Sequence, residues 1–112
     1  MIPTFDTPRK YYLNDKVDGD ALYGFIFKTD CRAKIFNIYL SLSYINAPNS
    51  KEYIFQDILW HKKERVHHYA PSDSLQVVIW WTRYGQLLVR MRLHLVGSTS
   101  GMYQVIISLE PT

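Results

Sequence analysis

The segment from Leu87 to Val96 constrains the fold more than any other part of the chain. Apolar residues stand at every second position, and Arg90, Arg92 and His94 stand between them. A period of two is typical of a β-strand, whose successive side chains point to opposite faces. The segment therefore predicts a strand with one apolar and one basic face, and we expect the apolar face, which includes Met91, to be buried.

Four further segments have strand character. The stretch from Lys34 to Ile45 alternates between an apolar and a polar face, and the stretch from Ala21 to Lys28 is apolar on both faces. Leu75 to Arg83 and Met102 to Leu109 are rich in β-branched and aromatic residues, as strands are. We expect the first two of these strands in the chain, which are joined by the polar turn 29–33, to form a hairpin.

The segment from Lys51 to Tyr69 changes to a helical period. At 100° per residue, six of its apolar side chains share one face of a helix. These are Ile54, Phe55, Ile58, Leu59, Val66 and Tyr69. Asn49 or Ser50 can cap the start of such a helix. Because Tyr53 and Trp60 fall off the apolar face, the sequence predicts two or three short helices rather than a single long one.

The chain is expected to form one domain. Its 112 residues are too few for two domains of ordinary size, and with 47% hydrophobic and 15% aromatic residues it is too apolar for a disordered polypeptide. Residues 1–20 contain two prolines and a polar run, and we expect them to be an N-terminal arm; residues 21–112 are then the domain. The predicted fold class is α+β, a five-stranded antiparallel sheet with short helices on one face. Its order is two strands, a short helical insert and three strands.

This order resembles that of a PAS domain, and several local sequences are similar to motifs of that family. Gly24-Phe-Ile-Phe-Lys-Thr-Asp30, followed by the strand from Lys34 to Ser43, looks like the first hairpin of the family. Glu52 to Leu59 is similar to a segment that usually has the sequence Glu-Leu-Ile-Gly-x-x-Ile in PAS domains. His61-Lys-Lys-Glu64 stands where the family has His-Pro-x-Asp, and Tyr84-Gly85-Gln86 stands where many members have an Asp-Gly turn.

The resemblance covers residues 21–110 and implies a sensory or protein-interaction module of signalling or transcriptional regulation. A PAS-like fold implies that ten apolar side chains line the interior between the sheet and the helices. They are Phe25, Phe27, Phe36, Ile38, Ile54, Ile58, Val89, Met91, Leu93 and Ile107. Such an interior leaves open a small apolar ligand, whereas the crowding of large aromatic side chains favours a filled core.

The pair Trp80-Trp81 indicates a contact surface. On a strand the two indoles lie on opposite faces, so one enters the core and the other faces outward, unless the helical insert covers one and the N-terminal arm the other. Tryptophan and arginine are enriched among the residues that dominate protein–protein binding. We therefore expect a protein partner, in a homodimer or a heterodimer, to bind the outer face of the sheet. The candidate interface residues are Trp80, Trp81, Leu88, Arg90, Arg92, His94 and Ile106.

Signals for catalysis and metal binding are weak. The phosphate-binding, dinucleotide-binding, zinc-protease and serine-hydrolase motifs do not occur, and the carboxylates are scattered along the sequence. His61, His67 and His68 have basic neighbours that repel a cation, and we expect them on a solvated helix face. Cys31 lies outside any helix N-terminus that would activate its thiol. We expect no enzyme activity, no metal site and no cofactor.

Charge and hydropathy limit the partners and the compartment. Thirteen Lys and Arg against ten Asp and Glu give a net charge of +3, which is small for a dedicated nucleic-acid binder. No apolar run reaches the roughly 18 residues of a membrane span, and a single cysteine fits a reducing compartment. We expect an intracellular protein, cytoplasmic or nuclear, with no membrane attachment, and do not expect this domain alone to bind nucleic acid. Two other function classes stay open: a self-associating assembly protein and a small basic nucleic-acid-binding domain.

Overall fold

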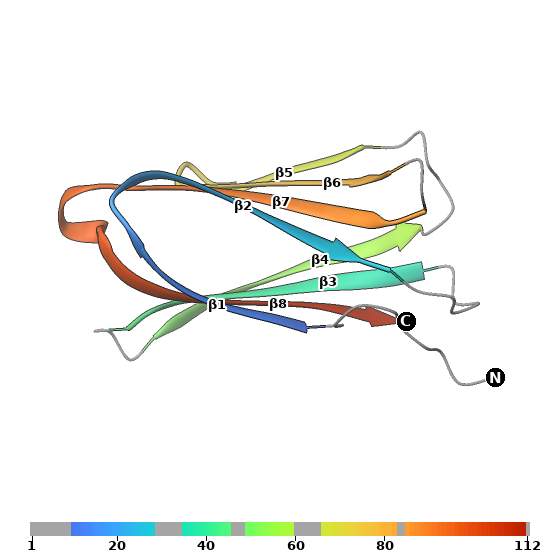
Figure 1. The fold of residues 1–112 in the computed structure, drawn as a ribbon, viewed down its shortest axis with the longest axis horizontal. Coiled ribbons are helices and arrows are strands. Elements are labelled where there is room, and N and C mark those ends of the chain that lie inside the picture. Colours follow the sequence, from blue (N-terminus) through green and yellow to red (C-terminus); the bar gives the residue numbers. More distant parts are fainter. Residues whose placement is uncertain (1–9, 29–34, 46–48, 60–65, 83–84, 112) are drawn as a thin grey trace.

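The alternating segments of the chain form strands that bury their apolar faces between two sheets. The computed structural model describes residues 10–28, 35–45, 49–59, 66–82 and 85–111, and it contains two four-stranded antiparallel sheets packed face to face (Figure 1). The strands are β1 (Lys10–Val17), β2 (Gly19–Phe27), β3 (Ile35–Tyr44), β4 (Ser50–Leu59), β5 (His67–Ser72), β6 (Leu75–Trp81), β7 (Leu87–Leu95) and β8 (Gly101–Pro111). A short 3-10 helix, η1 (Gly97–Thr99), lies between β7 and β8.

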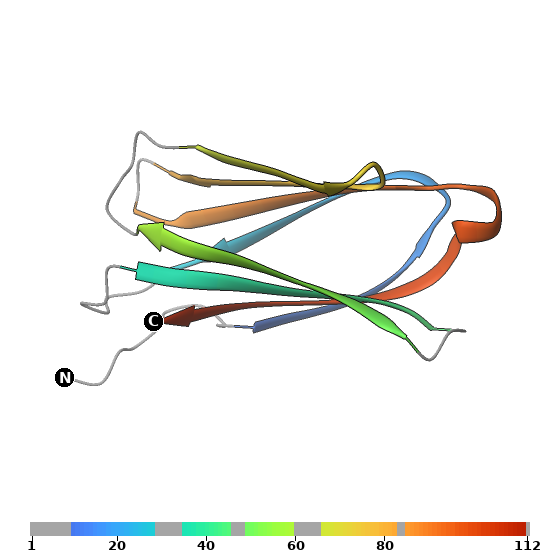
Figure 2. The same ribbon diagram turned by 180° about the vertical axis from the view of Figure 1, so that it is seen from behind.

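The two sheets have the strand orders β1-β8-β3-β4 and β2-β7-β6-β5. β1 and β2 follow each other directly in the chain, yet they lie at the edges of different sheets, and the chain turns between them at Gly19, whose φ is +98°. β1 pairs with β8 and β2 pairs with β7. Both connections, β1 to β2 and β7 to β8, therefore pass from one sheet to the other at the same end of the sandwich (Figures 1 and 2).

The predicted α+β fold is wrong. The described residues form no α-helix, and each sheet is covered by the other sheet rather than by helices. The predicted hairpin of the first two strands is also absent, because β2 pairs with β7 whereas β3 pairs with β4 and β8. The segments predicted as the last three strands correspond to β6, β7 and β8, but β8 belongs to the sheet opposite β6 and β7.

A β-bulge explains why β4 has the apolar spacing of a helix. Between Phe55 and Ile58, β4 carries one residue more than β3, which pairs with it. Asp57 in this bulge has a φ of +61°, and its N–H donates to Asn37 Oδ1 at 3.2 Å. The extra residue moves the inward side of the strand by one position, so Phe55 and Ile58 are both buried although they are three residues apart. The end of the predicted helical segment forms the start of β5, and the ring centroid of Tyr69 in β5 lies 4.5 Å from that of Phe55.

Residues 10–20, which we assigned to an N-terminal arm, form β1 and the start of β2. β1 pairs with β8 along its whole length. The ring of Tyr11 lies 5.5 Å from that of Phe25 and 5.3 Å from that of Phe27. Its hydroxyl donates to the carbonyl oxygen of Ile26 at 2.5 Å. This contact ties β1 to the edge strand of the opposite sheet.

The core lies between the sheets and is closely filled. In β7, the five apolar residues at alternate positions are buried, and the four residues between them lie on the outward side. The largest side chains that are less than 2% exposed come from six strands. They are Phe27, Phe36, Ile38, Leu40, Ile58, Leu75, Ile79, Leu87, Met91, Leu93, Ile107 and Leu109. Removal of this apolar surface from water is the main force that holds the two sheets together.

Replacing Met91 with Asp is expected to abolish cooperative folding. Met91 is fully buried at the centre of β7. An unpaired buried carboxylate costs several kcal/mol, against the roughly 5–15 kcal/mol that stabilises a domain. The control variant Gln76→Asp places a carboxylate at an exposed position of β6 opposite Arg92, where we expect a melting temperature close to that of the wild type. Equal losses in circular-dichroism melts of the two variants would contradict the burial of this face of β7.

Gly101 begins β8 beneath the ring of Tyr44. Its φ is +148°, and a Cβ at this position would lie 2.5 Å from Tyr44 Cε2. We expect Gly101→Ala to lower the free energy of unfolding by about 1–3 kcal/mol, the range for such backbone strain. In the double variant with Tyr44→Ala the steric conflict is gone, so the combined loss should be smaller than the sum of the two single losses. Urea denaturation measures these values, and strict additivity would show that the two residues are not in contact.

Candidate functional site

The outward side chains of β2, β7 and β6 form one continuous surface, which we call the outer face. β7 lies between β2 and β6, so it contributes the middle of this surface. The outer face comprises Asp20, Leu22, Gly24 and Ile26 of β2, Leu88, Arg90, Arg92 and His94 of β7, and Gln76, Val78 and Trp80 of β6. Residues opposite one another on neighbouring strands are side by side, so the register arranges these residues in rows across the sheet.

One end of the outer face is apolar. Ile26 lies opposite Leu88, and Leu88 lies opposite Trp80. Ile26 is 41% exposed, whereas Leu88 and Trp80 are half-buried. The guanidinium carbon of Arg90 lies 5.3 Å from the centroid of the Trp80 ring, in a cation–π contact. This end therefore presents an indole that is flanked by aliphatic side chains and bordered by an arginine.

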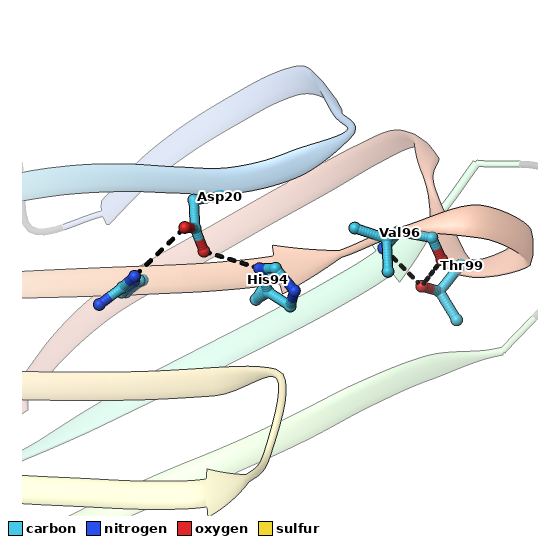
Figure 3. Close-up of polar contacts among 5 residues, drawn as sticks. Asp20, His94, Val96 and Thr99 are labelled. Carbon is cyan, nitrogen blue, oxygen red and sulfur yellow. Dashed lines mark hydrogen bonds and ion pairs between the residues drawn. The ribbon is translucent and has the colours of Figure 1, made fainter.

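The other end is charged, and Asp20 links its strands. Asp20 Oδ2 lies 3.2 Å from Arg92 Nη2, and Asp20 Oδ1 lies 2.7 Å from His94 Nδ1. Figure 3 shows the carboxylate of Asp20 reaching from β2 towards His94 on β7. The hydrogen bonds with His94 and Arg92 lower the pKa of Asp20 below its ordinary value. These contacts hold Arg92 and His94 towards β2.

A hollow of about 460 Å³ lies between the two ends. Gly24, which has no side chain, is opposite Arg90 at this place in the sheet. The lining residues are Asp20, Ala21, Leu22, Gln76, Val78, Arg90 and Arg92. Aliphatic carbons, two guanidinium groups and the carboxylate of Asp20 therefore meet in one hollow. Arg92 is paired with Asp20, whereas Arg90 has no ion pair with any residue in the described part of the chain.

Five of the seven predicted interface residues lie on the outer face: Trp80, Leu88, Arg90, Arg92 and His94. Trp81 points inward and is 6% exposed, so it belongs to the core. Ile106 does not join the others, because it lies on β8 opposite Tyr12 and Ser41, on the outward side of the other sheet. The structure thus brings together one indole, one leucine and the three basic residues of β7.

Nine of the ten predicted pocket residues are buried in the core. The exception is Ile54, which is 58% exposed on the outward side of β4. The other nine pack between the two sheets rather than lining a space between a sheet and helices. Leu93 also borders a groove of about 310 Å³ between the sheets, next to Tyr44, Tyr53 and Tyr103.

The histidines that we expected on a helix face are placed differently. His68 is exposed on β5, and His67 is half-buried with its ring 6.2 Å from that of Tyr69. His61 and Cys31 lie outside the described residues. Among the residues that the structure describes, no three His, Cys, Asp or Glu side chains gather into a group that could hold a metal ion. The same residues include no helix of the length and apolarity needed to cross a membrane.

Sequence reasoning missed the contribution of β2 to the outer face. Asp20 was assigned to the arm, and Leu22, Gly24 and Ile26 belong to a strand that is apolar on both sides, so its inward side could not be identified. The one local signal was Gly24, a residue without a side chain in the middle of an apolar strand. That Gly24 lies opposite Arg90 depends on the pairing of β2 with β7, which the local sequence does not reveal.

The pKa of Asp20 is expected to rise when either of its partners is removed. Because its pKa is lower in the folded than in the unfolded chain, Asp20 stabilises the fold above the unfolded pKa, and this contribution is lost as the pH falls through the folded pKa. Carboxyl carbon NMR titrations of His94→Gln and Arg92→Gln should each show a shift towards the ordinary value of 3.8. Lys16→Gln, on exposed β1, is the control. An Asp20 pKa that both variants leave unchanged would rule out these contacts in solution.

Comparisons with known proteins give no family for this chain. No protein-family model matches it, and neither curated proteins nor solved structures gave a match. The resemblance to PAS domains therefore gains no support from these comparisons.

Proposed function

We propose that this protein is a non-enzymatic binding module whose outer face docks an acidic protein partner. The observation that supports this most directly is the presence, on one sheet surface, of Trp80, aliphatic neighbours and two arginines. Tryptophan and arginine are enriched among the residues that contribute most of the binding energy at protein interfaces. A few apolar anchors with charged residues around them suit an interface between separately folded proteins.

The charges of the outer face favour an acidic partner. Arg90 has no ion pair among the described residues, so a carboxylate of the partner can pair with it without competing with a carboxylate in that part of the chain. Charge complementarity of this kind also speeds association and disfavours partners of the wrong charge. A second copy docked through the same face would add its own Arg90 and Arg92 to an interface in which each copy has one acidic residue, Asp20, already paired with Arg92 and His94. A different, acidic protein is therefore favoured over a homodimer.

We do not propose a role in signalling or transcription, because that expectation came from the PAS resemblance alone and the described residues form two packed four-stranded sheets instead of the expected PAS-like fold. Two other classes are outcomes of the tests below. A self-associating assembly protein would form large oligomers by itself. A nucleic-acid binder would be retained on DNA or RNA in a strongly salt-dependent way.

The first test selects partners from an unbiased library of random peptides displayed on phage. We expect the enriched peptides to combine Asp or Glu with an apolar anchor, and their affinity, measured by fluorescence anisotropy, to fall as the salt concentration rises. Enrichment of basic peptides, or of apolar peptides without acidic residues, would contradict an acidic partner. Light scattering of the chain alone shows whether it forms the large oligomers of an assembly protein. Retention on RNA and DNA columns shows whether it binds nucleic acid.

Trp80→Ala is expected to weaken the binding of an enriched acidic peptide by about 2 kcal/mol or more, the scale of an interface hot spot. The melting temperature should change little, because the indole lies on the outward side of β6. Ile106→Ala is the matched control, since it shortens an aliphatic side chain on the outward side of the other sheet and should leave the affinity unchanged. If the two variants weaken binding equally, or neither does, the binding surface is not the outer face.

A further inference from the structure

Gly24 is a glycine that the backbone conformation does not require. The glycines at positions 19, 85, 97 and 101 have positive φ angles, which other residues rarely adopt. Gly24 has no such angle, and it lies in the middle of β2 opposite Arg90. Any L-residue that favours strands can therefore adopt the conformation of Gly24.

Packing does not require this glycine either. A Cβ built on Gly24 meets no atom within 4 Å. Alanine would therefore fit without moving a neighbour. Glycine in a strand lowers stability, because it has no side chain to pack and loses more conformational freedom on folding. The strand thus carries a destabilising residue at a position where the backbone and the space around the Cβ do not require glycine.

Glycine inside a strand typically marks a bulge, a bend, or the close approach of a ligand or another backbone. The ladder between β2 and β7 runs without a register shift from Gly19 opposite Leu95 to Phe27 opposite Leu87, so there is no bulge. The turn of the chain between the sheets lies at Gly19, five residues before Gly24. Close approach from outside remains. Gly24 lies opposite Arg90, which lines the hollow, and the space that a side chain at position 24 would occupy is open.

We propose that this hollow is the anchor site for the acidic partner. A segment of the partner lies with its backbone against Gly24 and directs an Asp or Glu carboxylate to the guanidinium of Arg90, in the strong charge-assisted hydrogen bonds that arginine forms with carboxylates. Leu22, which is 64% exposed, and half-buried Val78 provide aliphatic walls for the carbon atoms of that side chain. Arg92, held by Asp20, borders the same hollow. This inference rests on the proposed function and adds the point of contact.

The experiment measures the affinity of Gly24→Ala and Gly24→Val for an acidic peptide from the phage selection. The Cβ that both variants add meets open space, so we expect melting temperatures that equal or exceed that of the wild type. We expect the affinity to fall about threefold with Ala and about tenfold or more with Val, whose larger side chain occupies more of the space beside Arg90 that the partner's backbone needs. Gln104→Val is the matched control, because it places the same side chain on the outward side of β8 in the other sheet and should leave the affinity unchanged.

A double-mutant cycle tests the carboxylate. Arg90→Gln in the protein is combined with Glu→Gln or Asp→Asn at each acidic position of the peptide. At one position we expect the double change to weaken binding no more than either single change, as for two groups that pair directly. Losses that multiply at every position overturn the pairing with Arg90.

The variants also separate this inference from the function on which it rests. If Gly24→Val binds as tightly as the wild type while Trp80→Ala loses affinity, the anchor site is overturned and the binding role of the outer face stands. If both variants bind like the wild type, both proposals are overturned. If Gly24→Val melts earlier than the wild type, Gly24→Ala decides, and unchanged affinity of the alanine variant overturns the anchor site.

Discussion

The mutual burial of two apolar sheet faces determines this structure. Each sheet has one apolar side, and since the described residues form no α-helix to cover it, the two sides leave water by facing each other. Met91 of β7 and Ile107 of β8 come from opposite sheets, and both are fully buried. Because strand side chains alternate, the residues that stand between the buried residues lie on the outward surfaces of the two sheets. The side chains at those outward positions determine what the chain can bind.

Strands with regular alternation could be predicted from the sequence, but their partners could not. β3 and β7 keep a period of two over ten and nine residues, which no helix accommodates. β2 pairs with β7 through residues as distant in sequence as Asp20 and His94, which are 74 positions apart. β4 was predicted as helical because one extra residue at Asp57 changes its apolar spacing from two to three. Local sequence does not distinguish such a bulge from a helical turn.

The residues of the candidate site that lie on a single strand could be predicted from the sequence. The alternation of residues in β7 was enough to predict that Arg90 and Arg92 lie on its basic side. Because Trp80 and Trp81 are consecutive in a strand, one of the two indoles was expected to point outward. Ile106 was grouped with them because the last three strands were expected in a single sheet, whereas the chain changes sheets between β7 and β8. A role of Gly24 in the candidate site could not be predicted from the sequence, because it depends on the position of Gly24 opposite Arg90. That position is set by the pairing of β2 with β7.

Chemical-shift mapping of the backbone amides by NMR, with an acidic peptide added to the labelled protein, tests most directly whether the outer face is the binding surface. We expect the largest shifts in residues 22–26, 76–80 and 88–94, which lie side by side on β2, β6 and β7. Shifts confined to β1, β8, β3 and β4, or spread evenly over both sheets, would contradict a binding role for the outer face.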